Sequence, residues 1–138
     1  GSYTAVDDEA SFARLSSVFS CMGDFYMRQL TVQQWLVSGG TPAAQAAAWT
    51  SAAFSAILAG SADALPGTFE GLVAEQTRGG LNEMVIREQR DDGAYDALAA
   101  SLDSVRHRKL TGAVDFELTP VAKRARKNVG PPSLSSAL

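Results

Sequence analysis

The spacing of the large apolar residues in the first third of the chain is the feature that most constrains its fold. Beyond an acidic start, these residues recur at steps of three and four: Phe12, Leu15, Phe19, Met22 and Tyr26. Such steps place side chains on one face of an α-helix, whereas a half-buried strand alternates at every second residue. The sequence therefore predicts a helix here, with a break or bend at Gly23-Asp24.

Strong stop and start signals follow this stretch. A second helix passes through Trp35 and ends at Gly39-Gly40, since glycine commonly closes a helix in the left-handed conformation. Thr41 is then expected to be the N-cap of the next helix, with Pro42 at its first position, where a missing N–H does no harm. This alanine-rich helix should run to about Ala59, and its many small side chains would permit a close approach of another helix.

Three further helices are expected after that one. A turn at "ALPGT" leads to a short helix, for which Thr68 is the expected N-cap. A helix from the Gly79-Gly80 pair should continue to about Arg90. Beyond the turn at Asp91-Asp92-Gly93, a last helix is indicated by apolar residues at helical spacing: Tyr95, Leu98, Ala99, Leu102 and Val105.

The chain thus predicts an all-α fold, a bundle of about six helices over residues 3–110. No alternating strand and no internal repeat is present. Residues 111–138 contain Pro120, the basic run at 123–127 and "GPPSLSSAL", and they are expected to form a flexible tail. The basic run has no interleaved aromatic residues, so a solvated tail is a better interpretation than a nucleic-acid site.

Charge and composition exclude several classes of protein. The formal net charge is −3, which gives the whole chain no attraction for nucleic acid or an anionic membrane. No apolar run approaches the ~20 residues that a bilayer span requires. Cys21 is the only cysteine, so no internal disulfide can form, and a cytoplasmic location is expected. The pair Gly1-Ser2 is typical of a protease-cleavage remnant and suggests a chain that begins inside a longer protein.

Few residues could support metal binding or nucleophilic catalysis. His107 is the only histidine, so the chain has no zinc ligand set of the usual composition. A dyad of Cys21 and His107 is conceivable but rare. Asp91-Asp92 could hold Mg²⁺, although two carboxylates before a glycine more often form an exposed turn.

The stretch "QTRGGLNE" is the strongest candidate site. In one account Gly79 caps the preceding helix and Gly80 continues the loop. In the other, glycines leading into a helix let a ligand approach the backbone, where first-turn N–H groups bind a carboxylate or phosphate. Arg78 would add positive charge, and Thr77 and Asn82 could donate hydrogen bonds. The residues alone favour neither account.

The segment "AEQTRGGLNEMVIREQRDDGAYDALAASLDSV" resembles the C-terminal helical domain of the pyrroline-5-carboxylate reductase family. Divergent members carry T-P-G-G-x-N-E before a helix, and then an acidic-glycine turn and an aromatic-containing helix. The matching residues here are Thr77, Gly79, Gly80, Asn82 and Glu83, followed by Gly93, Ala94, Tyr95 and Asp96. The resemblance extends over roughly residues 5–105.

This resemblance implies an NAD(P)H-dependent imine reductase whose helical domain forms an intertwined homodimer. It also implies a substrate carboxylate received at the helix start, with Thr77, Gly79, Gly80 and Asn82 facing it. Arg78 stands where the family has proline and Leu81 where it has threonine, which argues against pyrroline-5-carboxylate itself as the substrate. The family's N-terminal Rossmann domain is absent from this chain, so the chain alone is expected to be inactive in redox chemistry.

Two other readings stay open. The chain could be a stand-alone small enzyme or binding protein that kept the carboxylate pocket, with Arg78 and Glu83 as its charged groups. It could also be a purely structural association module in which Gly79-Gly80 is only a cap. A homodimer is expected if the chain is a reductase domain or an association module. Several helices are apolar in more than one direction, as at Phe25, Tyr26 and Met27, and such helices are buried on more than one side.

Overall fold

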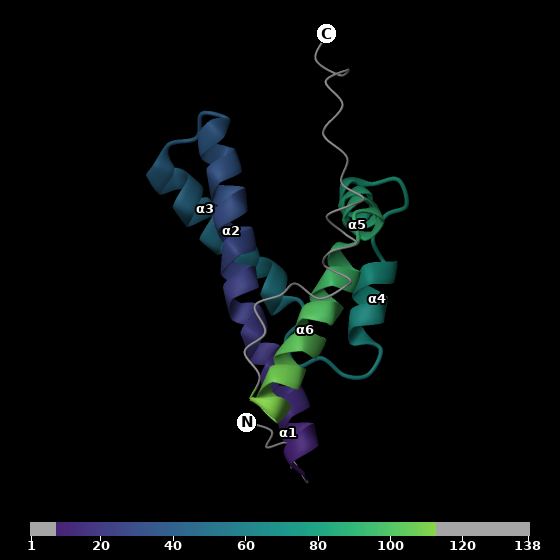
Figure 1. Ribbon diagram of the computed structural model, residues 1–138. Coiled ribbons are helices and arrows are strands. Elements are labelled where there is room, and N and C mark those ends of the chain that lie inside the picture. Colours follow the sequence, from purple (N-terminus) through teal and green to yellow (C-terminus); the bar gives the residue numbers. More distant parts are fainter. Residues whose placement is uncertain (1–7, 113–138) are drawn as a thin grey trace. The chain divides into compact units, whose positions relative to one another are not determined.

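The computed structural model of the protein describes residues 8–112, and every regular element among them is a helix. This confirms the all-α prediction. The elements, α1 to α6 with one 3-10 helix, η1, follow one another through short turns (Figure 1). The expected tail from 113 onward, including the basic run at 123–127, lies outside the described residues.

The chain divides into two compact units. Among the described residues, unit 1 combines two separate segments, 8–20 and 78–112, whereas unit 2 is the continuous segment Cys21–Thr77. A single helical domain over residues 3–110 therefore stays a prediction, and each unit is described below by itself.

Helix α1 (Glu9–Ser17) begins where the acidic start predicted a helix. Asp8 is its N-cap, and the Asp8 carboxylate accepts a hydrogen bond of 2.7 Å from the backbone N–H of Ser11. The helix gives way to η1 (Val18–Ser20), so the irregularity lies here and not at Gly23-Asp24. The predicted position was wrong because a glycine inside a helix costs only about 1 kcal/mol relative to alanine and need not interrupt it.

Helix α2 (Cys21–Ser38) ends at the predicted glycine pair. Gly40 adopts the left-handed conformation with φ of 101°. The N–H of Gly40 donates to the Val37 carbonyl and that of Thr41 to the Leu36 carbonyl, both at 3.0 Å. This is the Schellman arrangement, which satisfies carbonyls left over in the last turn. The prediction of a helix stop at Gly39-Gly40 is confirmed.

Helix α3 (Ala43–Ala59) starts one residue later than expected. Its N-cap is Pro42, whose ψ of 139° places it outside the helix, so the prediction of Thr41 as N-cap was wrong. No side chain caps this end, and the Pro42 carbonyl accepts the first helical bond, from the N–H of Ala46. The end at Ala59 agrees with the prediction.

Unit 2 is held together chiefly by the packing of α2 against α3, which lie side by side (Figure 1). The rings of Phe25 and Phe54 meet edge to face, with centroids 5.7 Å apart and planes at 86°. Ala46 and Thr50 are buried on α3. The two buried residues of α3 are thus small, while the ring contact joins large aromatic side chains.

Helix α4 (Thr68–Ala74) completes the regular structure of unit 2. Its N-cap is Gly67, with φ of 90°, and not Thr68. The Thr68 hydroxyl instead accepts a 3.0 Å hydrogen bond from the backbone N–H of Leu65. The predicted cap was wrong because this hydroxyl closes the preceding turn and does not bind a first-turn N–H of α4.

In unit 1, helix α6 (Ala94–Thr111) packs against both α1 and α5 (Leu81–Asp91). The Lys109 ammonium donates a 2.7 Å hydrogen bond to the Ser16 hydroxyl. On α1 the buried residues are Ala13 and Ser17. On α6, three members of the predicted apolar face are partly covered: Leu98, Leu102 and Val105.

The core of the described residues is small. The buried residues among them are Ala13, Ser17, Ala46 and Thr50, and no large side chain is fully buried. The apolar stripe that predicted the first helix is helical but uncovered, with Phe12 61%, Phe19 81% and Tyr26 60% exposed. Periodicity predicted the helical conformation correctly, but the buried residues of α1 are Ala13 and Ser17 and not the large apolar residues of the stripe.

Candidate functional site

The candidate site begins where α4 ends. Glu75 follows the helix in the right-handed conformation, and its N–H donates to the Gly71 carbonyl at 3.0 Å. The Gln76 side-chain amide reaches back and donates to the Leu72 carbonyl at 2.8 Å. Gln76 thereby satisfies a carbonyl in the last turn of α4, which ends at Ala74, before the glycine pair.

The two glycines have different conformations. Gly79 is left-handed with φ of 75°, and a Cβ built there would meet nothing within 4 Å, so the backbone angle and not crowding requires glycine. Gly80 is extended, with φ of −79° and ψ of 172°, and is the N-cap of α5. Gly79 therefore does not cap α4, and the pair belongs to the start of α5.

Gly80 supplies no capping side chain to α5. Its carbonyl accepts the first helical bond, from the N–H of Met84 at 3.0 Å. The start of α5 is thus formed by bare backbone, a geometry in which first-turn N–H groups and the helix dipole attract an anion.

One acidic side chain already occupies the first turn of α5. Glu83 Oε2 is buried and has no hydrogen-bond partner, although the guanidinium of Arg87 lies 3.6 Å away. A carboxylate at this place interacts favourably with the positive end of the helix. Glu83 therefore opposes a second anion, whereas Arg78 and Arg87 favour one.

The five predicted substrate-binding residues are adjacent in the chain but lie on its surface. Thr77, Arg78, Gly79 and Asn82 are exposed and Gly80 is half-buried. Thr77 belongs to unit 2 and the other four residues to unit 1. The local geometry can present backbone groups and the Arg78 guanidinium to a small anion.

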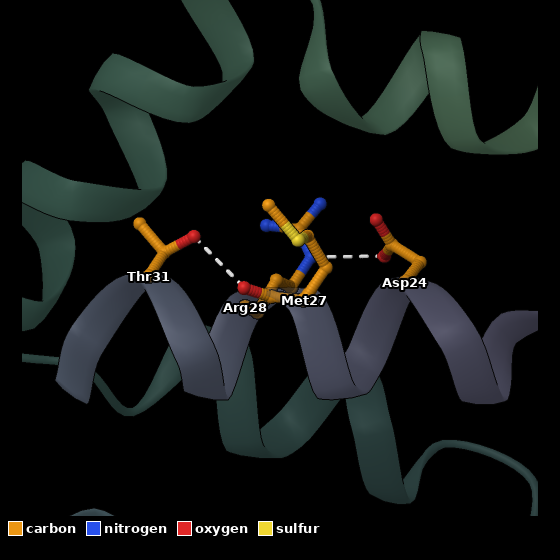
Figure 2. Close-up of polar contacts among 4 residues, drawn as sticks. All are labelled: Asp24, Met27, Arg28 and Thr31. Carbon is orange, nitrogen blue, oxygen red and sulfur yellow. Dashed lines mark hydrogen bonds and ion pairs between the residues drawn. The ribbon is translucent and has the colours of Figure 1, made fainter. Parts of the chain in front are cut away.

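A second group of polar contacts lies on α2. The Arg28 guanidinium pairs with the Asp24 carboxylate at 3.0 Å, and the Thr31 hydroxyl donates to the Met27 carbonyl at 2.8 Å (Figure 2). Both contacts join residues one helical turn apart, and the Arg28 and Asp24 side chains are about half exposed. They are local supports of the helix and provide no convergent set of groups for a ligand.

The other candidates gain no support from the structure. Cys21 is the first residue of α2 and half-buried, and His107 is exposed on α6. Over residues 8–112, no cluster of three or more histidine, cysteine or acidic side chains could hold a metal ion. None of the helices in that range is both long and apolar enough to cross a membrane.

The structural roles of two residues near the glycine pair were not predicted from the sequence. Gln76 closes α4, and Glu83 supplies a buried carboxylate oxygen and an ion pair to Arg87. The signal for the second was available, since glutamate and arginine four residues apart commonly pair on a helix. Gln76 had no comparable signal, because its role depends on where α4 ends.

Comparison of the chain with models of protein families, with curated proteins and with solved structures found no match.

Proposed function

We propose that this chain is the dimerisation and substrate-binding domain of a pyrroline-5-carboxylate-reductase-like, NAD(P)-dependent oxidoreductase. In this proposal its helices form an intertwined bundle with those of a second copy, and the turn at Gly79-Gly80 receives a substrate carboxylate. The observation that carries the proposal is helix α3, which has no charged residue and yet leaves large apolar side chains exposed.

Helix α3 is apolar around much of its circumference. One side, with Ala46 and Thr50, packs on α2, while Trp49 is 68%, Ile57 68% and Leu58 48% exposed. A helix that is hydrophobic on all sides is normally buried on all sides. Full burial of a large apolar side chain is worth roughly 1.5–3 kcal/mol, so covering these residues would stabilise the unit by several kcal/mol.

Helix α2 extends the uncovered apolar surface of unit 2. Trp35 is 73%, Met22 60% and Met27 57% exposed. A stable protein–protein interface buries about 1,200–2,000 Å² in total and is enriched in tryptophan, tyrosine and methionine. The resemblance to an intertwined family favours a second copy as the occupant of this surface.

The turn at the start of α5 supports the substrate-binding part of the proposal. Gly79 and Gly80 bring bare backbone to a helix N-terminus, and Arg78 precedes them on an exposed turn. Such donors bind carboxylates and phosphates, and the resemblance favours a carboxylate. The half-buried Glu83 side chain places a negative charge in the first turn and weakens this preference, which argues for a ligand whose charge is met mainly by Arg78.

The proposal assigns no nicotinamide cofactor to the described residues. Every regular element in residues 8–112 is helical, so this part of the chain has no strand–glycine-loop–helix unit to hold a dinucleotide pyrophosphate. In the proposal the cofactor is bound by another domain of the parent protein, and no redox step is assigned to this chain.

Light scattering of the purified chain tests the association. A mass of twice the chain mass over micromolar concentrations is expected, together with a thermal midpoint that rises with protein concentration, because association stabilises the folded state. A folded monomer at high concentration would overturn the dimer.

Amide chemical shifts test the binding site. Titration with L-proline as a probe carboxylate should shift the backbone amides of Gly80 and Leu81, and L-prolinamide, which lacks the carboxylate, should not shift them. Arg78→Ala should weaken the response, whereas Arg90→Ala, which changes an exposed arginine at the other end of α5, should leave it intact. Equal shifts with L-proline and L-prolinamide would contradict the proposed carboxylate site.

A purely structural association module is the second candidate, and two observations favour it. The predicted site residues are mostly exposed, and Glu83 already occupies the first turn of α5. The two experiments separate the candidates: a dimer that binds no carboxylate is an association module, and a dimer that binds one is a substrate domain.

A further inference from the structure

We draw no further inference here: the strongest candidate, the exposed apolar surface formed by Phe12, Leu15 and Phe19 on α1 and η1, carries nothing because nothing in the structure shows what covers it.

Discussion

Helices α3 and α5 have opposite surface chemistry. Helix α3 has no charged residue and no capping side chain, with Trp49 and Ile57 largely exposed. Helix α5 is shorter, and it has charged residues at nearly half of its positions: Glu83, Arg87, Glu88, Arg90 and Asp91. An ion pair within α5 joins Glu83 to Arg87.

This difference separates two ways of stabilising a helix. Helices α1, α2 and α5 each have a polar support of their own, such as the Asp8 cap or the Asp24–Arg28 pair. Isolated helices are marginal in water, and such supports add only tenths of a kcal/mol to about 1 kcal/mol. Helix α3 has no such support and depends on what packs against it.

The largest effect is expected on the exposed face of α3. Trp49→Asp places a charge at the centre of the proposed interface, where truncating a buried tryptophan commonly costs 2 kcal/mol or more. We expect the dimer dissociation constant to rise by roughly 100-fold, which corresponds to about 2.8 kcal/mol. Sedimentation equilibrium measures this change.

Leu81→Asp is the matched control for that substitution. Leu81 is 78% exposed on α5, and an acidic residue in the first turn of a helix is favourable. The mass of this variant should equal that of the unmodified chain. If both variants dissociate, or neither does, the contrast between α3 and α5 is wrong.

The next largest effect separates two glycines. Gly79 is left-handed, so Gly79→Ala should destabilise the fold by about 1–2 kcal/mol. Gly23 lies inside α2 with open space around its Cβ position, so Gly23→Ala should stabilise it by about 0.5–1 kcal/mol. Urea unfolding at one protein concentration gives both values, and changes of the same sign would contradict the assigned backbone conformations.

A smaller effect, confined to α1, is expected from the titration of Asp8. Hydrogen bonds from Ser11, chiefly from its backbone N–H, hold the pKa of the Asp8 carboxyl below its ordinary value. Because the folded-state pKa is the lower one, the stabilisation is complete above the ordinary pKa of about 4 and is lost as the pH falls through the folded-state value. The Ser11 amide shift should follow this titration.

Two variants distinguish the charge of Asp8 from its capping geometry. Asp8→Asn keeps a side-chain acceptor at the N-cap and should retain α1 without the pH dependence. Asp8→Ala should speed the hydrogen exchange of the α1 amides at neutral pH. A pH dependence that persists in Asp8→Asn would show that another group causes it.

The smallest effect is expected for the ion pair on α2. Asp24 and Arg28 are about half exposed, so a double-mutant cycle of Asp24→Asn and Arg28→Gln should give a coupling free energy of about 0.2–0.5 kcal/mol. The coupling should shrink in 1 M salt, since salt screens exposed charges. A coupling above about 1 kcal/mol would mean that this face of α2 is buried in the assembled protein.

Helix existence and the main helix ends could be predicted from the sequence. Gly39-Gly40 ended α2 as expected, since a left-handed glycine is a local requirement that residue type reveals. Caps were less predictable: Thr41 and Thr68 have the right side chains, but the backbone placed Pro42 and Gly67 at those positions. The choice depends on how the preceding turn closes.

Burial could not be predicted from periodicity. The stripe containing Phe12 and Phe19 is helical, yet small residues such as Ala13 and Ser17 make the contact instead. Periodicity shows which side chains lie on the same face of a helix. Which face is buried depends on the helix that packs against it, and that helix can be far away in the sequence. The role of the glycine pair at the candidate site could not be predicted either. Whether Gly79 and Gly80 end α4 or begin α5 depends on where α4 ends, and the sequence does not reveal that position.

The composite nature of unit 1 has a consequence for the order of folding. The Lys109–Ser16 hydrogen bond joins residues 93 positions apart, whereas α2 and α3 are consecutive helices. Closing a longer loop loses more chain entropy, and contacts between distant residues slow folding. During synthesis, α2 and α3 can pack together as soon as both have been made, whereas α1 cannot pack against α6 until the end of the described chain has been made. Until α6 has been made, Ala13 and Ser17, the residues of α1 that are buried in the folded unit, stay exposed to solvent.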